Sequence, residues 1–220
     1  MTISTAILVN GTFYRKRAQK MLGSAKAEDR ANELENYCMK HLSNSSQLHQ
    51  IFYYDCLPED KIIYHVYTKK NINYGESNFC SWMNTFINSL KAKRKFSLRL
   101  GKLVPRYENE YHTLKTNVLK ELFDGTKQFN ELTEDDFMLS VEQKGLEMQI
   151  AIDIASLAYK KEVNRIVFIS GDKDFLPAAK LARREGLDFI LDPLFNHISS
   201  DIIEHIDGLE TCDERFSPSK

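Results

Sequence analysis

Two aspartates stand close together in the string Ser170-Gly171-Asp172-Lys173-Asp174-Phe175, directly after the apolar run Ile166 to Ile169. Such a run predicts a buried strand of a parallel sheet, and binding sites in these sheets lie beyond the carboxyl ends of the strands. Gly171 would let the backbone turn so that Asp172 points into that crevice. Carboxylate oxygens suit Mg²⁺ or Mn²⁺. The simpler alternative is that both aspartates cap the following helix, and the complete string leads us to favour a metal site.

A third carboxylate, Asp153, lies in a stretch from about 146 to 159 that is apolar on most sides and has the spacing of a helix. An ionised carboxylate in apolar surroundings is costly unless it is paired or bound to metal. Asp153 also belongs to a narrow polar stripe that could simply face water, so this alternative stays open. Glu147, near the start of the helix, fits equally well as a further acidic ligand or as a charge that favours the helix N-terminus.

The elements that must position these carboxylates alternate between strands and helices. We expect strands over 5–9, 50–55, 96–104, 165–170 and 187–191, and helices over 79–90, 146–159, 176–184 and 198–209. This alternation predicts an α/β fold with a central, mainly parallel sheet of about five strands. We expect a single domain over residues 1–211, with an insertion at about 106–139 that is helical at 111–123. Residues 212–220 are expected to form a loosely ordered tail.

Several segments around the carboxylates resemble the NYN branch of the PIN-like nucleases. The resemblance rests on Gln143-Lys144-Gly145-Leu146-Glu147, Ala151-Ile152-Asp153, Leu157-Ala158, Ser170 to Phe175, Ile7 to Gly11, and Tyr53-Tyr54-Asp55. It is most specific over residues 143–175. The resemblance implies a PIN-like three-layer sandwich and an endoribonuclease that hydrolyses RNA phosphodiester bonds with Mg²⁺ or Mn²⁺. It also implies that Asp153 and Asp172 hold the catalytic metal, with Asp174 holding a second ion or orienting the first, and Glu147 as a further ligand.

One position departs from the family pattern, which places an aspartate at the end of the first strand where this chain has Asn10. Asparagine still offers a carbonyl oxygen but no negative charge, so metal binding and water activation should be weaker. Asn10 therefore belongs to the predicted catalytic set together with Asp153, Asp172 and Asp174, and the exchange can disable the enzyme. A natural inactive relative, an active enzyme that tolerates Asn, and an engineered inactive variant all remain open.

Two groups of basic residues are candidates for RNA binding, with aromatic side chains nearby that could stack on bases. The first group, Arg15, Lys16 and Arg17, follows the first strand, and the second includes Lys95 and Arg99. The expected partner is RNA, as single strands or structured loops. A run of charges can equally be a face that only contacts solvent. The sequence therefore does not decide between RNA binding and simple solvent exposure.

Composition limits the classes of protein that this chain can represent. It has 220 residues, 42% of them hydrophobic, and its 30 basic and 31 acidic side chains nearly cancel. A protein that coats nucleic acid by bulk charge would be far more basic, so RNA contacts must come from local patches. The four cysteines form no CxxC pair, which favours a reducing compartment. With no signal-peptide pattern and no membrane-length apolar stretch, we expect a cytoplasmic protein without a membrane partner.

Two other functions compete with the metal-dependent ribonuclease. A non-catalytic RNA-binding module could keep the fold after losing the charge at position 10. A flap-type nuclease acting on DNA would also suit the Ser-Gly-Asp-Lys-Asp string, although the segment from Glu147 to Ala158 argues against it. Cleavage of RNA compared with DNA separates these alternatives.

Overall fold

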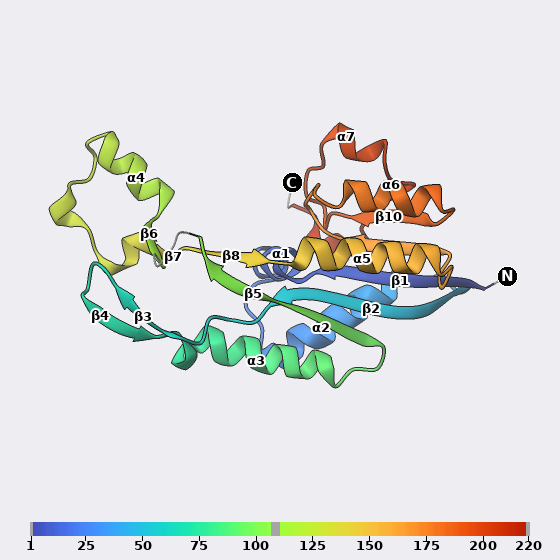
Figure 1. Cartoon of the computed structure of the whole chain (residues 1–220), viewed down its shortest axis with the longest axis horizontal. Helices are drawn as coiled ribbons and strands as arrows, with labels where there is room; N and C mark the ends of the chain where they lie inside the picture. Colours follow the sequence, from blue (N-terminus) through green and yellow to red (C-terminus); the bar gives the residue numbers. More distant parts are fainter. Residues whose placement is uncertain (1, 107–110, 219–220) are drawn as a thin grey trace.

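A seven-stranded sheet organises the chain in this computed structural model, which describes residues 2–106 and 111–218 (Figure 1). The strands follow the order β11-β10-β9-β1-β2-β5-β8. Neighbours are parallel from β11 through β5, whereas β8 pairs antiparallel with β5. These strands are β1 (Ile3–Asn10), β2 (Ser46–Cys56), β5 (Phe96–Pro105), β8 (Val141–Lys144), β9 (Arg165–Ile169), β10 (Asp188–Asp192) and β11 (Gly208–Leu209).

Side chains of β1 alternate between two buried layers, one on each face of the sheet. Ala6 and Leu8 pack in the layer under α5 (Leu146–Tyr159) and α6 (Leu176–Arg184). Ile7 and Val9 pack in the opposite layer, which contains apolar side chains of α1 (Gly11–Leu22), α2 (Ala27–Lys40) and α3 (Asn78–Lys91). Figure 1 shows α5 and α6 on one side of the sheet and α2 and α3 on the other. Because both faces are covered, the central strands are continuous apolar runs.

The predicted α/β class is confirmed, and the sheet has seven strands where about five were expected. The five strands expected from apolar runs are β1, β2, β5, β9 and β10, which form the parallel centre of the sheet. The additional strand β8 is short and only partly buried, and β11 has two residues, so neither carries the apolar signal of a core strand.

A lobe outside the sheet is built from two separate segments of the chain, at the left of Figure 1. It contains the hairpin of β3 (Ile62–His65) and β4 (Lys70–Asn73), the pair β6 (His112–Leu114) and β7 (Phe137–Leu139), and α4 (Thr116–Phe123). The rings of His65 and His112 join the two segments with centroids 4.2 Å apart. The insertion expected at about 106–139 is thus one part of a lobe that also includes residues 62–73. Its helix covers only 116–123 of the expected 111–123, of which 111 is the first described residue after the gap.

Acidification is expected to loosen this lobe before the sheet unfolds. Burial and the neighbouring His65 lower the pKa of His112 below its ordinary value of 6.5. Since the unfolded lobe then binds more protons than the folded one, this contribution to stability is present above about pH 6.5 and is lost as the pH falls through the folded pKa. Hydrogen exchange at about pH 7.5 and pH 5, corrected for intrinsic rates, should show lower protection of lobe amides in acid.

A His112→Phe variant is the matched control for this pH effect, because it keeps an aromatic ring but cannot titrate. Its lobe protection should not depend on pH in this range. Equal protection of the lobe in the unmodified protein at both pH values would contradict the prediction.

The C-terminal segment packs on the core, so the prediction of a loose tail over 212–220 is wrong for residues 212–218, and residues 219–220 lie outside the described part. This segment contains a short 3-10 helix, Glu214–Phe216. Similar 3-10 helices occur elsewhere at Tyr74–Glu76, Phe129–Glu131 and Glu134–Asp136. Phe216 is buried, with its ring 6.3 Å from that of Tyr14 and 5.2 Å from that of Tyr37. The Arg17 guanidinium donates to the Phe216 carbonyl. The sequence did not predict this packing because a single aromatic residue in a polar stretch gives no periodic pattern.

The helix expected over 198–209 is also wrong in extent, since α7 covers only Ser200–Ile203. Gly208 instead pairs with Ile190 of β10. A Cβ at position 208 would lie 2.7 Å from the end of the Ile190 side chain, which would have to shift to admit a larger residue. In the part of the chain that the structure describes, no helix has both the length and the apolar character needed to cross a membrane.

Candidate metal centre

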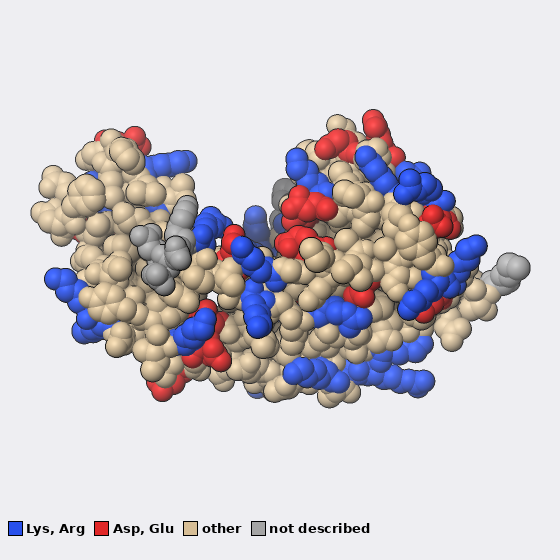
Figure 2. All heavy atoms as spheres, in the orientation of Figure 1, with Lys and Arg blue, Asp and Glu red and all other residues tan. Residues whose placement is uncertain are grey.

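A pocket lies at the carboxyl edge of the sheet, where β1 and β9 end and α5 begins. Val9 pairs with Ile169, and Asn10 pairs with Tyr54, so the ends of three strands lie side by side. The pocket is lined by Asn10, Tyr54, Gln143, Leu146, Glu147, Ile150, Phe168, Ser170, Asp172, Asp174 and Phe175. Four of the five residues predicted for the centre therefore meet in one place, and Asp153 is the exception. Figure 2 shows the surrounding hollow between the outer lobe and the helical layer, with acidic side chains along its wall.

Asp172 closes the turn after β9 rather than capping α6. Its Oδ1 accepts hydrogen bonds from the backbone N–H groups of Lys173 at 2.7 Å and Asp174 at 3.2 Å. The helix α6 begins after Phe175 without a side-chain cap. The capping alternative therefore does not describe this turn. Asp172 and Asp174 both line the pocket, and neither carboxylate starts the helix.

Gly171 is required for a reason other than the expected sharp turn. Its backbone is not in the left-handed region, but a Cβ there would lie 2.4 Å from the Phe13 ring. The close approach of Phe13, from the first turn of α1, thus explains the glycine. This contact packs the start of α1 against the turn that carries Asp172. The segment after β1 and the segment after β9 are therefore in contact beside the pocket.

Asn10 serves as the N-cap of α1. Its Oδ1 accepts a hydrogen bond of 3.1 Å from the backbone N–H of Phe13. Aspartate at this position could make the same bond, and its charge would be favoured by the helix N-terminus. An Asn10→Asp exchange should therefore preserve the fold while adding a charge to the pocket.

The Asp153 carboxylate faces the sheet and accepts hydrogen bonds from side chains of β2 and β5. Its Oδ2 accepts from Arg99 Nε at 2.9 Å and from the Tyr54 hydroxyl at 2.9 Å. Burial and the Asp153 carboxylate raise the pKa of Tyr54 above its usual range, so the hydroxyl keeps the proton that it donates. The Asp153 charge is thus compensated by Arg99, and its predicted role as a direct metal ligand is not supported by this arrangement. It contacts the pocket through Tyr54 instead.

A buried carboxylate outside the predicted set of site residues, Asp55, lies beside the pocket at the end of β2. It is fully buried and accepts from Arg15 Nε at 2.8 Å, the Tyr53 hydroxyl at 2.7 Å and Thr12 Oγ1 at 3.0 Å. The signal was present, because Asp55 ends a strand at the same edge as Asn10 and Asp172. Its oxygens are taken up by these donors, so Asp55 acts as a structural anchor for α1.

Of the five predicted RNA-binding residues, four bind other groups of the protein, and only Lys16 is exposed at the rim of the site. Arg15 is paired with Asp55 and Arg99 with Asp153. Arg17 donates to backbone carbonyls of Leu194, Phe195 and Phe216. Lys95 donates to the Leu48 carbonyl and precedes β5, so it lies at the edge of the sheet opposite the pocket. Lys16 is exposed and lines the outer rim of the centre together with Asn10, Glu147 and Asp172.

The donor set of the pocket fits Mg²⁺ or Mn²⁺. Asp172, Asp174 and Glu147 are exposed carboxylates, and Asn10 adds an amide oxygen. Among the described residues these carboxylates do not bring three ligand atoms within 4.8 Å of one another. Mg²⁺ keeps several of its waters and uses only one or two protein carboxylates besides substrate phosphates. An open pocket of oxygen ligands is therefore a suitable environment for it.

Comparison with known proteins identifies the class. The family model of the NYN domain matches residues 108–205. This confirms the predicted resemblance: over this range the sequence matches the NYN domain, a branch of the PIN-like superfamily. The match includes Glu147, Asp153, Asp172 and Asp174. The match with this family suggests a nuclease-like function for the chain.

Other comparisons add less. A solved structure of a protein of unknown function from Vibrio parahaemolyticus is similar to this chain, with 12% identity and a TM-score of 0.49. The similarity covers 98% of this chain and 96% of that one. No curated protein matches the sequence.

Proposed function

We propose that this chain is a PIN-like sandwich enzyme, a divalent-metal-dependent endoribonuclease whose centre is the pocket formed by Asp172, Asp174, Glu147 and Asn10. The observation that carries the proposal is the meeting of these oxygen ligands at the carboxyl edge of a parallel sheet. That edge is where open α/β sheets bind their ligands. The nuclease character of the NYN domain and the acidic pocket support the same conclusion from independent directions.

Each pocket residue has a role that follows from its position. Asp172 would be the principal ligand, because the turn fixes one of its oxygens and the residue lines the pocket. Asp174 and Glu147 line the same pocket and would hold the metal together with Asp172, directly or through water. When bound, Mg²⁺ or Mn²⁺ would activate water for in-line attack on phosphorus and neutralise charge on the phosphate oxygens. Lys16 at the rim is placed to bind a neighbouring phosphate of the RNA.

Asp153 has a different role in this proposal, as a positioning residue. Through Tyr54 and Arg99 it ties α5 to β2 and β5, and α5 carries Glu147 at its start. The pair with Arg99 places Glu147 relative to the strand ends without contributing a ligand to the metal.

A second candidate, a non-catalytic RNA-binding module, is favoured by one specific observation. Asn10 makes a complete N-cap bond as a neutral side chain, so the position has a structural use that needs no catalysis. A DNA-cutting flap-type nuclease is the third candidate. The same assay discriminates among all three.

Asn10→Asp is expected to raise metal-dependent RNA cleavage by on the order of 10²-fold, because it adds a charge beside the ion without changing the cap. The measurement compares both proteins on labelled RNA and on DNA of the same sequence, with Mg²⁺, Mn²⁺ or EDTA. Cleavage of RNA that EDTA abolishes supports the proposal. Equal RNA binding without cleavage by either protein would establish the binding module, and preferential cleavage of DNA would establish the flap-type alternative.

A further inference from the structure

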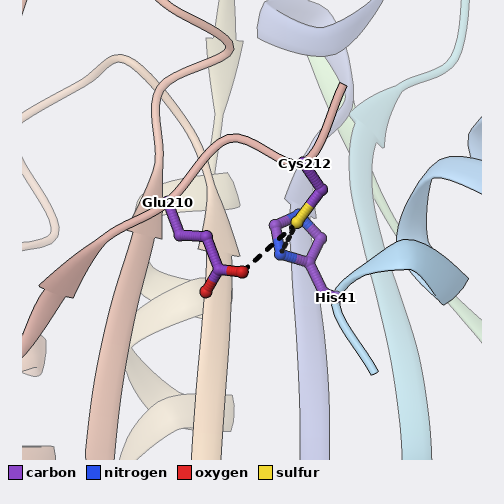
Figure 3. Close-up of side chains that lie close together, drawn as sticks. All are labelled: His41, Glu210 and Cys212. Carbon is purple, nitrogen blue, oxygen red and sulfur yellow. Dashed lines mark hydrogen bonds between the residues drawn. The ribbon is translucent and has the colours of Figure 1, made fainter. Parts of the chain in front are cut away.

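Three potential metal ligands of different chemistry converge away from the acidic pocket. They are His41, just after α2, and Glu210 and Cys212, which follow β11. Cys212 Sγ lies 3.2 Å from His41 Nδ1 and 3.5 Å from Glu210 Oε1 (Figure 3). The three ligand atoms all lie within 4.8 Å of one another, and the described residues contain no other such group.

The orientation of the His41 ring is fixed from behind by Asp192. His41 Nε2 lies 2.9 Å from Asp192 Oδ2, and both side chains are fully buried. The same carboxylate accepts from the Tyr37 hydroxyl, the Leu194 backbone N–H and the Thr211 hydroxyl. Asp192 therefore holds the Nε2 side of the imidazole ring, and Nδ1 is directed at Cys212 Sγ. A carboxylate behind a histidine is the usual support of a metal-binding imidazole.

Cys212 Sγ contacts two potential ligand atoms at once, His41 Nδ1 and Glu210 Oε1. A thiol has one hydrogen to donate, so it can serve only one of these two contacts at a time. A metal ion that replaces the thiol hydrogen would satisfy all three atoms.

We propose that His41, Glu210 and Cys212 form a Zn²⁺ site, with Asp192 as its supporting carboxylate and water as the fourth ligand. Sulfur and imidazole nitrogen select Zn²⁺ over the hard ions that suit the acidic pocket. With Zn–S of about 2.3 Å and Zn–N or Zn–O of about 2.0 Å, a tetrahedral ion separates its ligand atoms by roughly 3.5 Å. The two contacts of Cys212 Sγ, at 3.2 Å and 3.5 Å, are already close to this spacing, and the third pair of ligand atoms lies within 4.8 Å. Glu210 is exposed, so water can reach the fourth position.

The order of groups Cys212, His41 and Asp192 also matches that of a cysteine nucleophile with its base and orienting acid. Such a nucleophile requires a thiol pKa near or below neutrality. Burial and the Glu210 carboxylate instead raise the pKa of Cys212 to about 12. A structural ion agrees better with the surroundings, since it would join the end of α2 to the segment that leads into the packed C-terminus.

The test is Zn²⁺ binding by the full chain, purified without chelator, followed by metal analysis and titration of the metal-free protein against a chromophoric chelator. One equivalent of Zn²⁺ is expected. Cys212→Ser should weaken affinity by at least about 10²-fold, since loss of a supporting group alone costs 10- to 100-fold. Glu210→Gln, an exposed exchange that keeps the fold, should weaken it by about 10-fold or more. Co²⁺ should give a thiolate charge-transfer band that Cys212→Ser removes.

Asp172→Asn is the matched control, because it removes a carboxylate from the acidic pocket and should leave Zn²⁺ affinity unchanged. Failure to bind one equivalent of Zn²⁺, or equal affinity in the Cys212→Ser and Glu210→Gln proteins, would overturn the proposal and reduce the cluster to a thiol–imidazole hydrogen bond. Since the readout is binding of Zn²⁺ alone, the result does not depend on whether the chain cleaves RNA.

Discussion

Asp172→Asn, introduced into the Asn10→Asp protein, is expected to reduce metal-dependent RNA cleavage by on the order of 10³-fold. Asp172 is the one pocket carboxylate held in place by two backbone hydrogen bonds, at 2.7 Å and 3.2 Å. Replacing it by asparagine removes the charge that binds the ion at the position where the structure holds it most firmly. The rate is measured under single-turnover conditions with saturating Mn²⁺ and labelled RNA.

The exchange should leave the fold intact, which makes its result interpretable. The asparagine Oδ1 can accept the same bonds from the backbone N–H groups of Lys173 and Asp174. Asp124→Asn is the matched control, because Asp124 is an exposed carboxylate in the outer lobe. The control should cleave at the parental rate. If Asp172→Asn and Asp124→Asn cleaved equally well, Asp172 could not be the principal ligand.

Arg15→Ala is expected to lower the free energy of unfolding by about 3–5 kcal/mol, because it leaves the buried Asp55 carboxylate without its compensating charge. Asp55 is fully buried, and the Arg15 guanidinium approaches both of its oxygens, at 2.8 Å and 3.0 Å. For a chain of this length the change corresponds to a decrease of roughly 10 °C in the melting temperature.

Urea denaturation of Arg15→Ala, compared with Lys20→Ala, measures this effect. Lys20 is exposed on the same helix, so its loss should change stability by no more than about 0.5 kcal/mol. A loss below about 1 kcal/mol for Arg15→Ala would mean that the pair does not anchor α1.

Local sequence patterns predicted the parallel centre of the fold well, because buried strands and amphipathic helices leave periodic signals. Residues 146–184 are the best example, since α5, β9 and α6 lie where their apolar residues indicated. The edge strand β8 and the hairpin of β3 and β4 have short, mixed patterns that do not distinguish strands from loops. The packed tail was missed because it depends on one aromatic residue, Phe216.

The site was predictable in position but not in its pairings. The strings around Asp172 and Glu147 indicated the correct edge of the sheet, since strand ends in a parallel sheet share one edge. The partner of Asp153 is Arg99, 54 positions away in sequence. That of Asp55 is Arg15, 40 positions away. Long-range ion pairs of this kind have no local periodicity, so both arginines resembled free RNA-binding residues in the sequence.

The most direct test of the acidic pocket as a ribonuclease centre is the rate of RNA cleavage by the Asn10→Asp protein as a function of Mn²⁺ concentration, measured beside Mn²⁺ binding. We predict that cleavage rises and saturates with the same Mn²⁺ dependence as binding, that EDTA abolishes it, and that Asp172→Asn removes both. Cleavage that persists in EDTA, or Mn²⁺ binding that Asp172→Asn leaves unchanged, would contradict the account.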